Sequence, residues 1–376
     1  MKIPRYYKDL TPHIRPNKAL IIFGPRQAGK TTLLKDYLDG QKGKIKYKLE
    51  SGDDIIAQEA IGSQDFAKIK KYAKGYELIA IDEAQKIKNA GWGLKIMVDE
   101  IPGIKIIATG SSSFELAGQV GEPLTGRKIN LTLYPVSQME LRNLYNNYEL
   151  ESHLEEFMVY GSYPEVVAND DVDEKRRILN EIVGSYLLKD ILEMEKVKGS
   201  KVLLDLLRLL AFQVGNEVSL SELGRQLGLD YKTVERYLDL FEKSFIVYNL
   251  RGFSRNLRKE ITKKSKYYFL DNGIRNAIIA NFNPFNLRDD VGALWENFMF
   301  TEMIKSGSYK NRYANRYFWR TWDQKEIDYI EEREGKLFAY EFKWNDKAKT
   351  PKEFLETYPN AEFKIINKDN YLDFIL

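Results

Sequence analysis

The chain has 376 residues, 43% of them hydrophobic, and this length predicts two or three domains with hydrophobic cores. It contains no cysteine and two histidines, His13 and His153, which excludes disulfide bonds and cysteine-ligated zinc and argues against sites built from several histidines. The formal net charge is +3, no signal peptide follows Met1, and no run reaches the roughly 18 apolar residues of a membrane helix, so we expect no membrane partner and a cytoplasmic protein.

The first predicted element is an apolar strand from Ala19 to Phe23, followed by a glycine-rich loop and a helix. The loop and the helix start fit the pattern G-x-x-x-x-G-K-T, in which glycines let the backbone turn and approach phosphate closely. Backbone amides and the helix N-terminus attract anionic oxygens, the lysine adds positive charge for the β- and γ-phosphates, and the threonine hydroxyl is a Mg²⁺ ligand. The sequence therefore predicts a site for ATP and Mg²⁺ formed by Gly24, Pro25, Arg26, Gln27, Ala28, Gly29, Lys30, Thr31 and Thr32.

A second apolar run, from Glu77 onward, ends in the two carboxylates Asp82 and Glu83. Such a run predicts a buried parallel strand, and the ligands of open α/β sheets bind at the carboxyl ends of the strands. We expect Asp82 to hold Mg²⁺ through water and Glu83 to polarise the water that attacks the γ-phosphate. The alternative is a strand that simply ends in a solvated turn.

A third strand, Ile104–Gly110, is followed by Ser111, which we expect to contact the γ-phosphate or the attacking water from the neighbouring strand end. An ordinary helix cap is the alternative for this serine. Further on, Arg127 is a candidate arginine finger that would neutralise transition-state charge, in cis or across a subunit boundary. A surface salt bridge is the alternative for Arg127.

Together, the loop GPRQAGKTTL, the strand LIAIDEAQ, the strand end TGSSS and the stretch TGR…LTLYPVSQMEL resemble a group of prokaryotic AAA-type ATPases. In that group a small ATPase domain precedes a winged helix and a nuclease-like C-terminal domain. The resemblance implies an α/β fold: a parallel P-loop sheet, a helical and winged-helix region, and a small α/β domain like that of restriction endonucleases. It also leaves open that the chain forms a homo-oligomer. The domain boundaries we expect are 1–145 for the ATPase domain, 146–200 for a helical region, 201–275 for the winged helix and 276–376 for the nuclease-like domain.

The middle of the chain contains a candidate helix-turn-helix. A capped helix ends at Gly228, and Asp230 can cap the following helix, Tyr231–Lys243. The strand-like segments 244–250 and 266–270 would form a wing around a basic stretch. The basic residues of this stretch are Arg251, Arg255, Arg258, Lys259, Lys263, Lys264 and Lys266. In a DNA-binding role, the residues facing the major groove would be Tyr231, Lys232, Thr233 and Arg236, and the lysines of the wing would hold phosphate.

The alternative for this region is a protein–protein adaptor. Three acids on or beside the candidate recognition helix, Asp230, Glu235 and Asp239, weaken docking on DNA because they repel phosphate.

The C-terminal part carries a helix with Glu296 and a pair of strands with the pattern D-x12-E-x-K, formed by Asp328, Glu341 and Lys343. Residues i and i+2 of a strand share a face, so Glu341 and Lys343 point the same way, and Asp328 can meet them from the adjacent strand. Two carboxylates bind one or two hard cations, which polarise a phosphodiester and activate water. The pattern resembles the PD-(D/E)XK nuclease core at these three positions, with Glu296 as a further metal ligand.

A solvated strand face is the alternative for this pattern. Two functions therefore stay open: an ATP-driven device that acts on DNA, or a nucleotide-gated signalling ATPase whose C-terminal domains bind protein and do not catalyse. In both, ATP and ADP are the ligands of the N-terminal domain.

Overall fold

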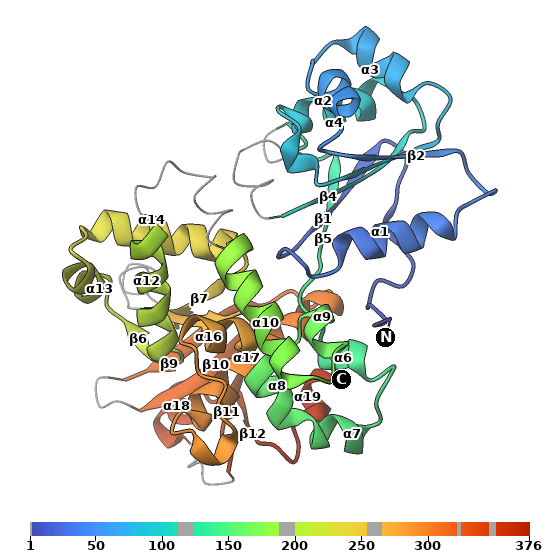
Figure 1. The fold of residues 1–376 in the computed structure, drawn as a ribbon. Coiled ribbons are helices and arrows are strands. Elements are labelled where there is room, and N and C mark those ends of the chain that lie inside the picture. The colour runs from blue at the N-terminus through green and yellow to red at the C-terminus, as the bar shows by residue number, and fades with distance from the viewer. Residues whose placement is uncertain (1, 112–122, 188–199, 254–264, 322–324, 346–350) are drawn as a thin grey trace.

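The computed structural model describes residues 2–111, 123–187, 200–253, 265–321, 325–345 and 351–376. Over these residues the chain forms an N-terminal lobe around one sheet and a larger second lobe around another (Figure 1). Within the described residues, no helix is both long and apolar enough to cross a membrane.

The N-terminal sheet has five parallel strands in the order β2-β3-β4-β1-β5. Its central strands are almost fully buried because helices cover both faces, which is the usual setting of a parallel sheet. This confirms the expected parallel α/β sheet. Its strands are β1 (Lys18–Phe23), β2 (Tyr47–Ser51), β3 (Leu78–Asp82), β4 (Lys105–Gly110) and β5 (Lys128–Thr132).

Alternate residues of β1 point to opposite faces of this sheet. Ile21 packs into a core shared with α2–α4, whereas Leu20 and Ile22 pack with α1 and the N-terminal segment. A short 3₁₀ turn (Thr11–His13) precedes β1, and another (Ala84–Lys86) follows β3. The helices of this lobe are α1 (Lys30–Asp39), α2 (Ile55–Ile61), α3 (Phe66–Ala73) and α4 (Ala90–Glu100).

The second lobe contains a seven-stranded mixed sheet in the order β12-β11-β10-β9-β7-β8-β6. The parallel pairing of β7 with β9, through Arg251 with Tyr317 and Gly252 with Phe318, joins the candidate wing hairpin to the C-terminal strands. One sheet thus crosses the expected domain boundary at residue 275, because β9 pairs with the backbone N–H and C=O groups along the edge of β7 that β8 does not cover. Its strands are β6 (Glu217–Val218), β7 (Val247–Gly252), β8 (Ser265–Phe269), β9 (Asn315–Arg320), β10 (Glu326–Arg333), β11 (Lys336–Phe342) and β12 (Glu362–Ile366).

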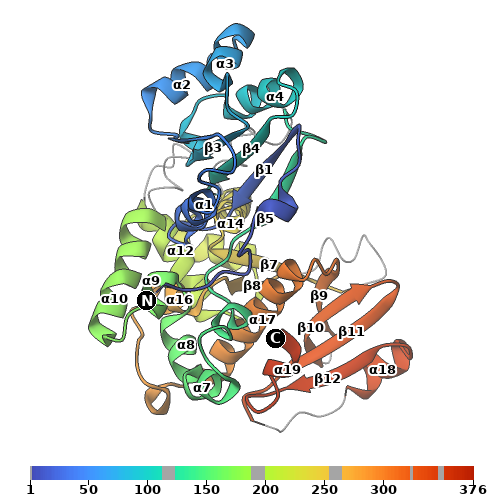
Figure 2. The same ribbon diagram turned by 90° about the vertical axis from the view of Figure 1, so that its right-hand side faces the viewer.

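Helices cover both faces of this second sheet (Figure 2). The long helix α17 packs on one face, where Phe300 meets Tyr329, and α18 packs on the other, where Phe354 meets Trp319. A π-helical turn (Ile182–Leu187) follows α10. The helices of the lobe are α6 (Gln138–Leu141), α7 (Asn147–Ser152), α8 (Leu154–Tyr160), α9 (Pro164–Val167), α10 (Val172–Glu181), α12 (Ser200–Phe212), α13 (Leu220–Leu227), α14 (Tyr231–Lys243), α16 (Asn272–Ile278), a 3₁₀ turn (Phe285–Leu287), α17 (Val291–Tyr309), α18 (Lys352–Thr357) and α19 (Leu372–Ile375).

Candidate nucleotide site and acid–lysine cluster

The loop between β1 and α1 has the backbone that its glycines permit. Gly24 and Gly29 adopt φ values of 149° and 92°, and a Cβ on Gly24 would lie 2.1 Å from the carbonyl oxygen of Leu133. Within the described residues, no side chain caps the start of α1, so its first amides face the loop. A helix N-terminus arranged in this way attracts an anion.

Four side chains meet at the carboxyl ends of β1, β3 and β4. The buried ammonium of Lys30 donates to the carbonyl oxygens of Gly24 and Pro25, both at 2.8 Å. The hydroxyl of Thr31 donates to Asp82 Oδ2 at 2.8 Å, and the hydroxyl of Thr109 donates to Asp82 Oδ1. A hydroxyl and a carboxylate in contact beside a phosphate cradle are the oxygen donors that Mg²⁺ prefers, so these residues fit the expected ion.

Glu83 is held beside this group by its backbone and by its carboxylate. It adopts a left-handed φ of 54°, its N–H donates to Thr109 Oγ1 at 3.1 Å, and its carboxylate accepts from the amide of Gln85. Thr109 thus holds the backbone of Glu83 and the carboxylate of Asp82 together at the ends of β3 and β4. Thr109 was missed by sequence reasoning, although a lone hydroxyl near the end of an otherwise apolar strand was the available signal.

The other two expected residues of this site lie differently. Ser111 is buried just after β4, two residues beyond Thr109, and its role stays a prediction. Arg127 precedes β5, and its carbonyl accepts from Ala19 at the amino end of β1, which is the edge opposite the phosphate loop. There its Nε lies 2.6 Å from Asp99 Oδ1. This geometry does not support a finger role in cis, because the sheet separates Arg127 from its own loop. A role across a subunit boundary stays a prediction.

Arg5, from the N-terminal segment, links the phosphate loop to the second lobe. Its guanidinium is buried, and it donates to the carbonyl oxygens of Ala28 and Tyr134 and, through Nε at 2.9 Å, to Glu140 Oε1. The Glu140 carboxylate also accepts from the N–H of Tyr6 at 2.7 Å. Arg5 therefore holds the phosphate loop through the carbonyl oxygen of Ala28. No feature of the sequence had indicated this role.

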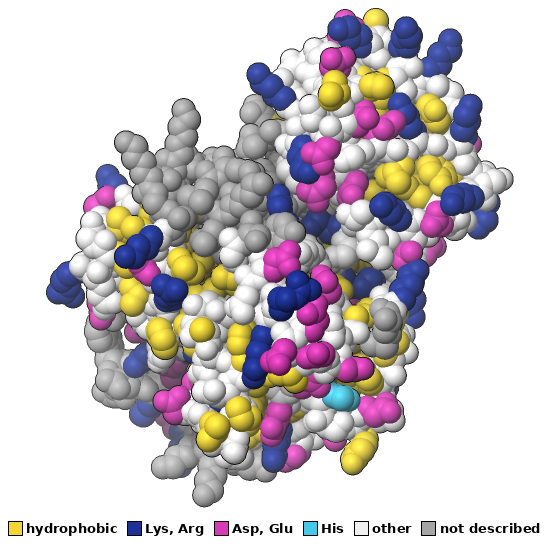
Figure 3. Space-filling view, viewed as in Figure 1, with side chains coloured by type: hydrophobic (Ala, Val, Ile, Leu, Met, Phe, Trp, Pro, Cys, Tyr) yellow, Lys and Arg dark blue, Asp and Glu magenta, His cyan; other side chains and the backbone are white. Residues whose placement is uncertain are grey.

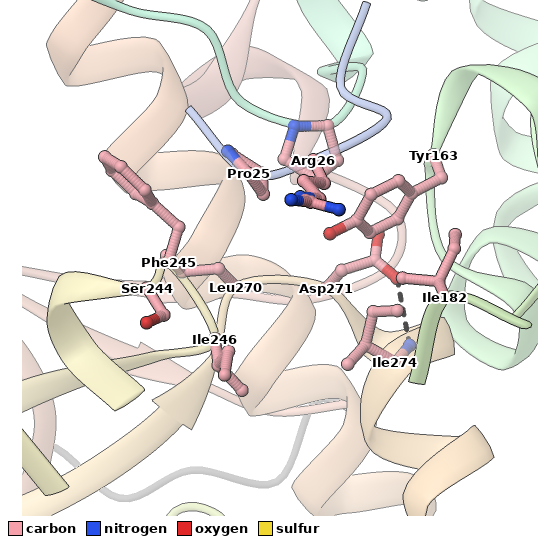
Figure 4. A pocket seen from close by; sticks show the side chains of 11 residues that line it. Pro25, Arg26, Tyr163, Ile182, Ser244, Phe245, Ile246, Leu270, Asp271 and Ile274 are labelled. Carbon is pink, nitrogen blue, oxygen red and sulfur yellow. Dashed lines mark hydrogen bonds between the residues drawn. The ribbon is translucent and has the colours of Figure 1, made fainter. Parts of the chain in front are cut away.

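A small cavity of about 30 Å³ lies where the phosphate loop faces the second lobe (Figure 4). Arg26 projects beside Tyr163 and Asp271 in this view. The Asp271 carboxylate accepts from the N–H of Ser162 at 2.7 Å and of Ile274 at 3.1 Å, yet burial raises the pKa of this carboxyl. Residues of the phosphate loop and of the second lobe thus line the same cavity.

A second group of ionisable side chains lies in the second lobe, and we call it the acid–lysine cluster. It draws on β8, α17, β10 and β11, so it exists only because the wing hairpin and the C-terminal strands share one sheet. Its members are Lys266, Glu296, Glu326, Asp328, Glu341 and Lys343.

The expected Asp–Glu–Lys triplet comes together in this cluster. Lys343 Nζ lies 2.7 Å from Glu341 Oε1 and 3.8 Å from Asp328 Oδ2. The N–H of Phe342 also donates to Asp328 Oδ2 at 2.8 Å. Burial, together with the charges of Glu296 and Glu341, raises the pKa of Asp328, and burial raises the pKa of Glu341. Within the described residues, no group of three or more His, Cys, Asp or Glu is arranged to hold a metal ion.

One expectation for the wing is wrong. Lys266 is not a phosphate-binding residue of the basic stretch, because its side chain is 0% exposed. Its ammonium pairs instead with Glu296 Oε1, at 3.2 Å, and with Glu326. Arg251 is exposed as expected, while five basic residues of the stretch lie outside the described residues: Arg255, Arg258, Lys259, Lys263 and Lys264.

The candidate recognition helix α14 presents Tyr231, Lys232 and Arg236 to solvent. Thr233 is half-buried and is occupied in capping, since its N–H and hydroxyl both donate to Asp230, at 3.0 and 2.6 Å. Over the face of the molecule in Figure 3, acidic and basic side chains lie interspersed, in keeping with the small net charge.

Three family models match parts of the chain. Residues 16–142 match an AAA domain, residues 151–284 a domain of unknown function (DUF8612), and residues 291–372 another domain of unknown function (DUF4143). The first match and the parallel sheet support an AAA-type P-loop ATPase domain at the N-terminal end, as expected. The winged-helix and nuclease-like domains fall in the other two regions and stay predictions.

Similar proteins occur in archaea and bacteria. The uncharacterized protein MJ1544 of Methanocaldococcus jannaschii is 23% identical over 96% of this chain and 83% of its own length. An uncharacterized protein of Haemophilus influenzae is 28% identical over 82% of this chain and 78% of its own. The uncharacterized protein Rv2008c of Mycobacterium tuberculosis is 25% identical over 86% and 70%.

Among solved structures, similarity extends to AMPPCP-bound DnaA from Aquifex aeolicus, with a TM-score of 0.27 and 16% identity, covering 60% of this chain and 82% of that one. It also extends to PCH-2 of C. elegans, with a TM-score of 0.25 and 18% identity, covering 61% and 63%. Both TM-scores lie below the range of a shared overall fold.

Proposed function

We propose that the N-terminal lobe binds ATP with Mg²⁺ and hydrolyses it. The observation that carries this proposal is the contact between the Thr31 hydroxyl and the Asp82 carboxylate beside the loop that holds Lys30. Thr31 and Asp82 would hold the ion, which neutralises phosphate charge when bound, and Lys30 would turn from the loop carbonyls to the β- and γ-phosphates.

Glu83 would orient the attacking water in this reaction. Its carboxylate accepts a hydrogen bond from Gln85 and its backbone N–H donates to Thr109, so the conformational freedom of the carboxylate is restricted. Thr109 also holds Asp82, which ties the group that orients water to the group that holds the ion. Catalysis of this kind consists mainly of positioning and electrostatic stabilisation.

The test is ATP turnover by the full chain, with phosphate release measured for three variants. Lys30→Ala is expected to abolish binding and turnover, and Glu83→Gln to keep ATP bound while turnover falls by about a hundredfold or more. Lys35→Ala removes an exposed lysine from the same helix and is the matched control, expected to change neither. Turnover by Glu83→Gln equal to that of the parent chain would refute the assignment of Glu83.

We further propose that the second lobe acts on DNA, with α14 against the duplex and the acid–lysine cluster as a cation-dependent phosphodiesterase. The support is the convergence of Asp328, Glu341 and Lys343 from two adjacent strands. Two carboxylates with water and a substrate phosphate suffice to bind Mg²⁺ or Mn²⁺, so this donor set fits a hard divalent ion. Lys343 would stabilise the charge that develops on the phosphate.

Cleavage of labelled single- and double-stranded DNA in the presence of Mn²⁺ tests this second proposal. Glu341→Gln is expected to abolish cleavage, whereas Glu362→Gln, on the exposed end of the neighbouring strand β12, is expected to leave it unchanged. Intact DNA with the parent chain would refute nuclease activity. The alternative is a nucleotide-gated switch whose second lobe binds protein. Intact DNA, together with ATP turnover that does not respond to added DNA, would favour this alternative.

A further inference from the structure

The four carboxylates of the acid–lysine cluster form two pairs, and each pair contacts a different lysine. Glu296 accepts from the ammonium of Lys266, at 3.2 Å, and from the hydroxyl of Tyr268, at 2.6 Å. Glu326 pairs with the same ammonium and lies 3.4 Å from the guanidinium of Arg320. This half of the cluster therefore already contains cationic and hydroxyl donors for both acids.

Asp328 and Glu341, in the other half, pair with Lys343. The Lys343 side chain is 39% exposed and reaches the pair from the end of β11, so it can swing toward solvent without disturbing the core. A flexible lysine of this kind yields its place to an incoming divalent cation, whose charge is larger and whose oxygen coordination is stronger.

Lys266 cannot leave in the same way. Its side chain is fully buried, it extends from β8 between β6 and β7, and its ammonium lies 5.4 Å from the centre of the Phe318 ring. Moving this ammonium to solvent would require the sheet to open, and removing it would take from Glu296 and Glu326, both partly buried, the cation that they share.

We propose that Lys266 is a resident cation of this site, so that the cluster binds one divalent ion, between Asp328 and Glu341, and Glu296 is not a metal ligand. A second ion beside Glu296 and Glu326 would have to share their oxygens with an ammonium already in contact with both, against strong like-charge repulsion. This inference rests on the proposed cation-dependent function of the cluster. It gives Glu296 a different role from the metal ligand expected from the sequence.

Titration of the full chain with Mn²⁺, with free Mn²⁺ measured by electron paramagnetic resonance, counts the bound ions. The Asp82→Asn background without nucleotide removes the carboxylate donor of the phosphate-loop site, so the count reports on the second lobe. We expect one saturable site per chain. Two sites would overturn the inference and leave the proposed function standing, whereas no site would overturn both.

Two further variants in the same background locate the ion. Glu341→Gln is expected to weaken Mn²⁺ binding by at least about tenfold. Glu296→Gln removes a charge but no ligand, so it is expected to change affinity by less than about threefold. A loss with Glu296→Gln as large as that with Glu341→Gln would overturn the assignment.

Lys266→Met provides an independent readout, because it removes the ammonium from between Glu296 and Glu326 and leaves these carboxylates able to bind a second ion. The parent chain is expected to bind one Mn²⁺ and this variant two. A folded variant that still binds one would contradict the role of Lys266. If the variant does not fold, the count for the parent chain and the effect of Glu296→Gln decide the question.

Discussion

Replacing Arg5 with methionine tests how the phosphate loop is held. The Arg5 guanidinium donates to the carbonyl of Ala28, whose peptide group continues to Gly29. Because a trans peptide is planar, its C=O and N–H point in opposite directions, so fixing the Ala28 oxygen behind the loop turns the Gly29 N–H toward the phosphate side. Arg5→Met frees this peptide and leaves the Glu140 carboxylate, whose side chain is 0% exposed, without its cation.

Two magnitudes follow from this geometry. Removing one partner of a buried ion pair costs about 3–5 kcal/mol, which is the expected loss in the free energy of unfolding. A hydrogen bond from a charged donor is worth about 1.5–3 kcal/mol, and part of that restrains the Ala28–Gly29 peptide. We therefore expect the dissociation constant for ATP to rise by about tenfold or more in the folded variant.

The assay pairs urea unfolding with fluorescent-nucleotide binding at a temperature where each variant is folded. Arg288→Met is the matched control, since the Arg288 side chain is also buried and donates to Asp290 and Asn281, which do not belong to the phosphate loop. It is expected to lose stability but not ATP affinity. Unchanged ATP affinity in Arg5→Met would refute the positioning argument and leave Arg5 a purely structural residue.

The remaining predictions concern Thr109, Asp271 and the pair of Arg5 with Glu140. Thr109→Val keeps the shape of the side chain but releases Asp82 and the backbone of Glu83, so kcat is expected to fall by about tenfold or more with a smaller change in ATP affinity; equal losses in both would contradict this. Burial raises the pKa of Asp271 above its unfolded value, so its contribution to stability is full below about pH 4 and is lost as pH rises through the raised pKa. Relative to Asp271→Asn, the parent chain should therefore lose Tm as pH rises from about 4, and a constant difference in Tm would argue against this sign. In a double-mutant cycle, Arg5→Met and Glu140→Gln are expected to be non-additive by about 1 kcal/mol or more in unfolding free energy, and additive effects would show that the pair is not coupled.

Local patterns were enough to predict the N-terminal site. The phosphate loop, the Asp82–Glu83 pair and their strands follow from short segments in which apolar runs, glycines and charged residues occur in a fixed order. The parallel sheet then brings the strand ends together, as the contact between Thr31 and Asp82 illustrates. Thr109 was missed because its contacts with Asp82 and Glu83 depend on side-chain direction near a strand end, which spacing alone does not determine.

Contacts between distant segments could not be predicted in this way. Arg5 and Glu140 are 135 residues apart, and nothing near either residue indicates the other. Lys266 belongs to a basic stretch in sequence, but its strand β8 lies between β7 and β6, and its ammonium contacts Glu296 on α17 and Glu326 on β10. The expected boundary at residue 275 had separated Lys266 from the acids that it neutralises.

Nucleotide binding by the N-terminal lobe is tested most directly by calorimetric titration of the full chain with ATP, in Mg²⁺ and in excess chelator. We expect saturable binding that is strengthened by Mg²⁺ in the parent chain, weakened to the chelator level in Thr31→Ala, and absent in Lys30→Ala. Equal ATP binding by the parent chain and Lys30→Ala would contradict this expectation.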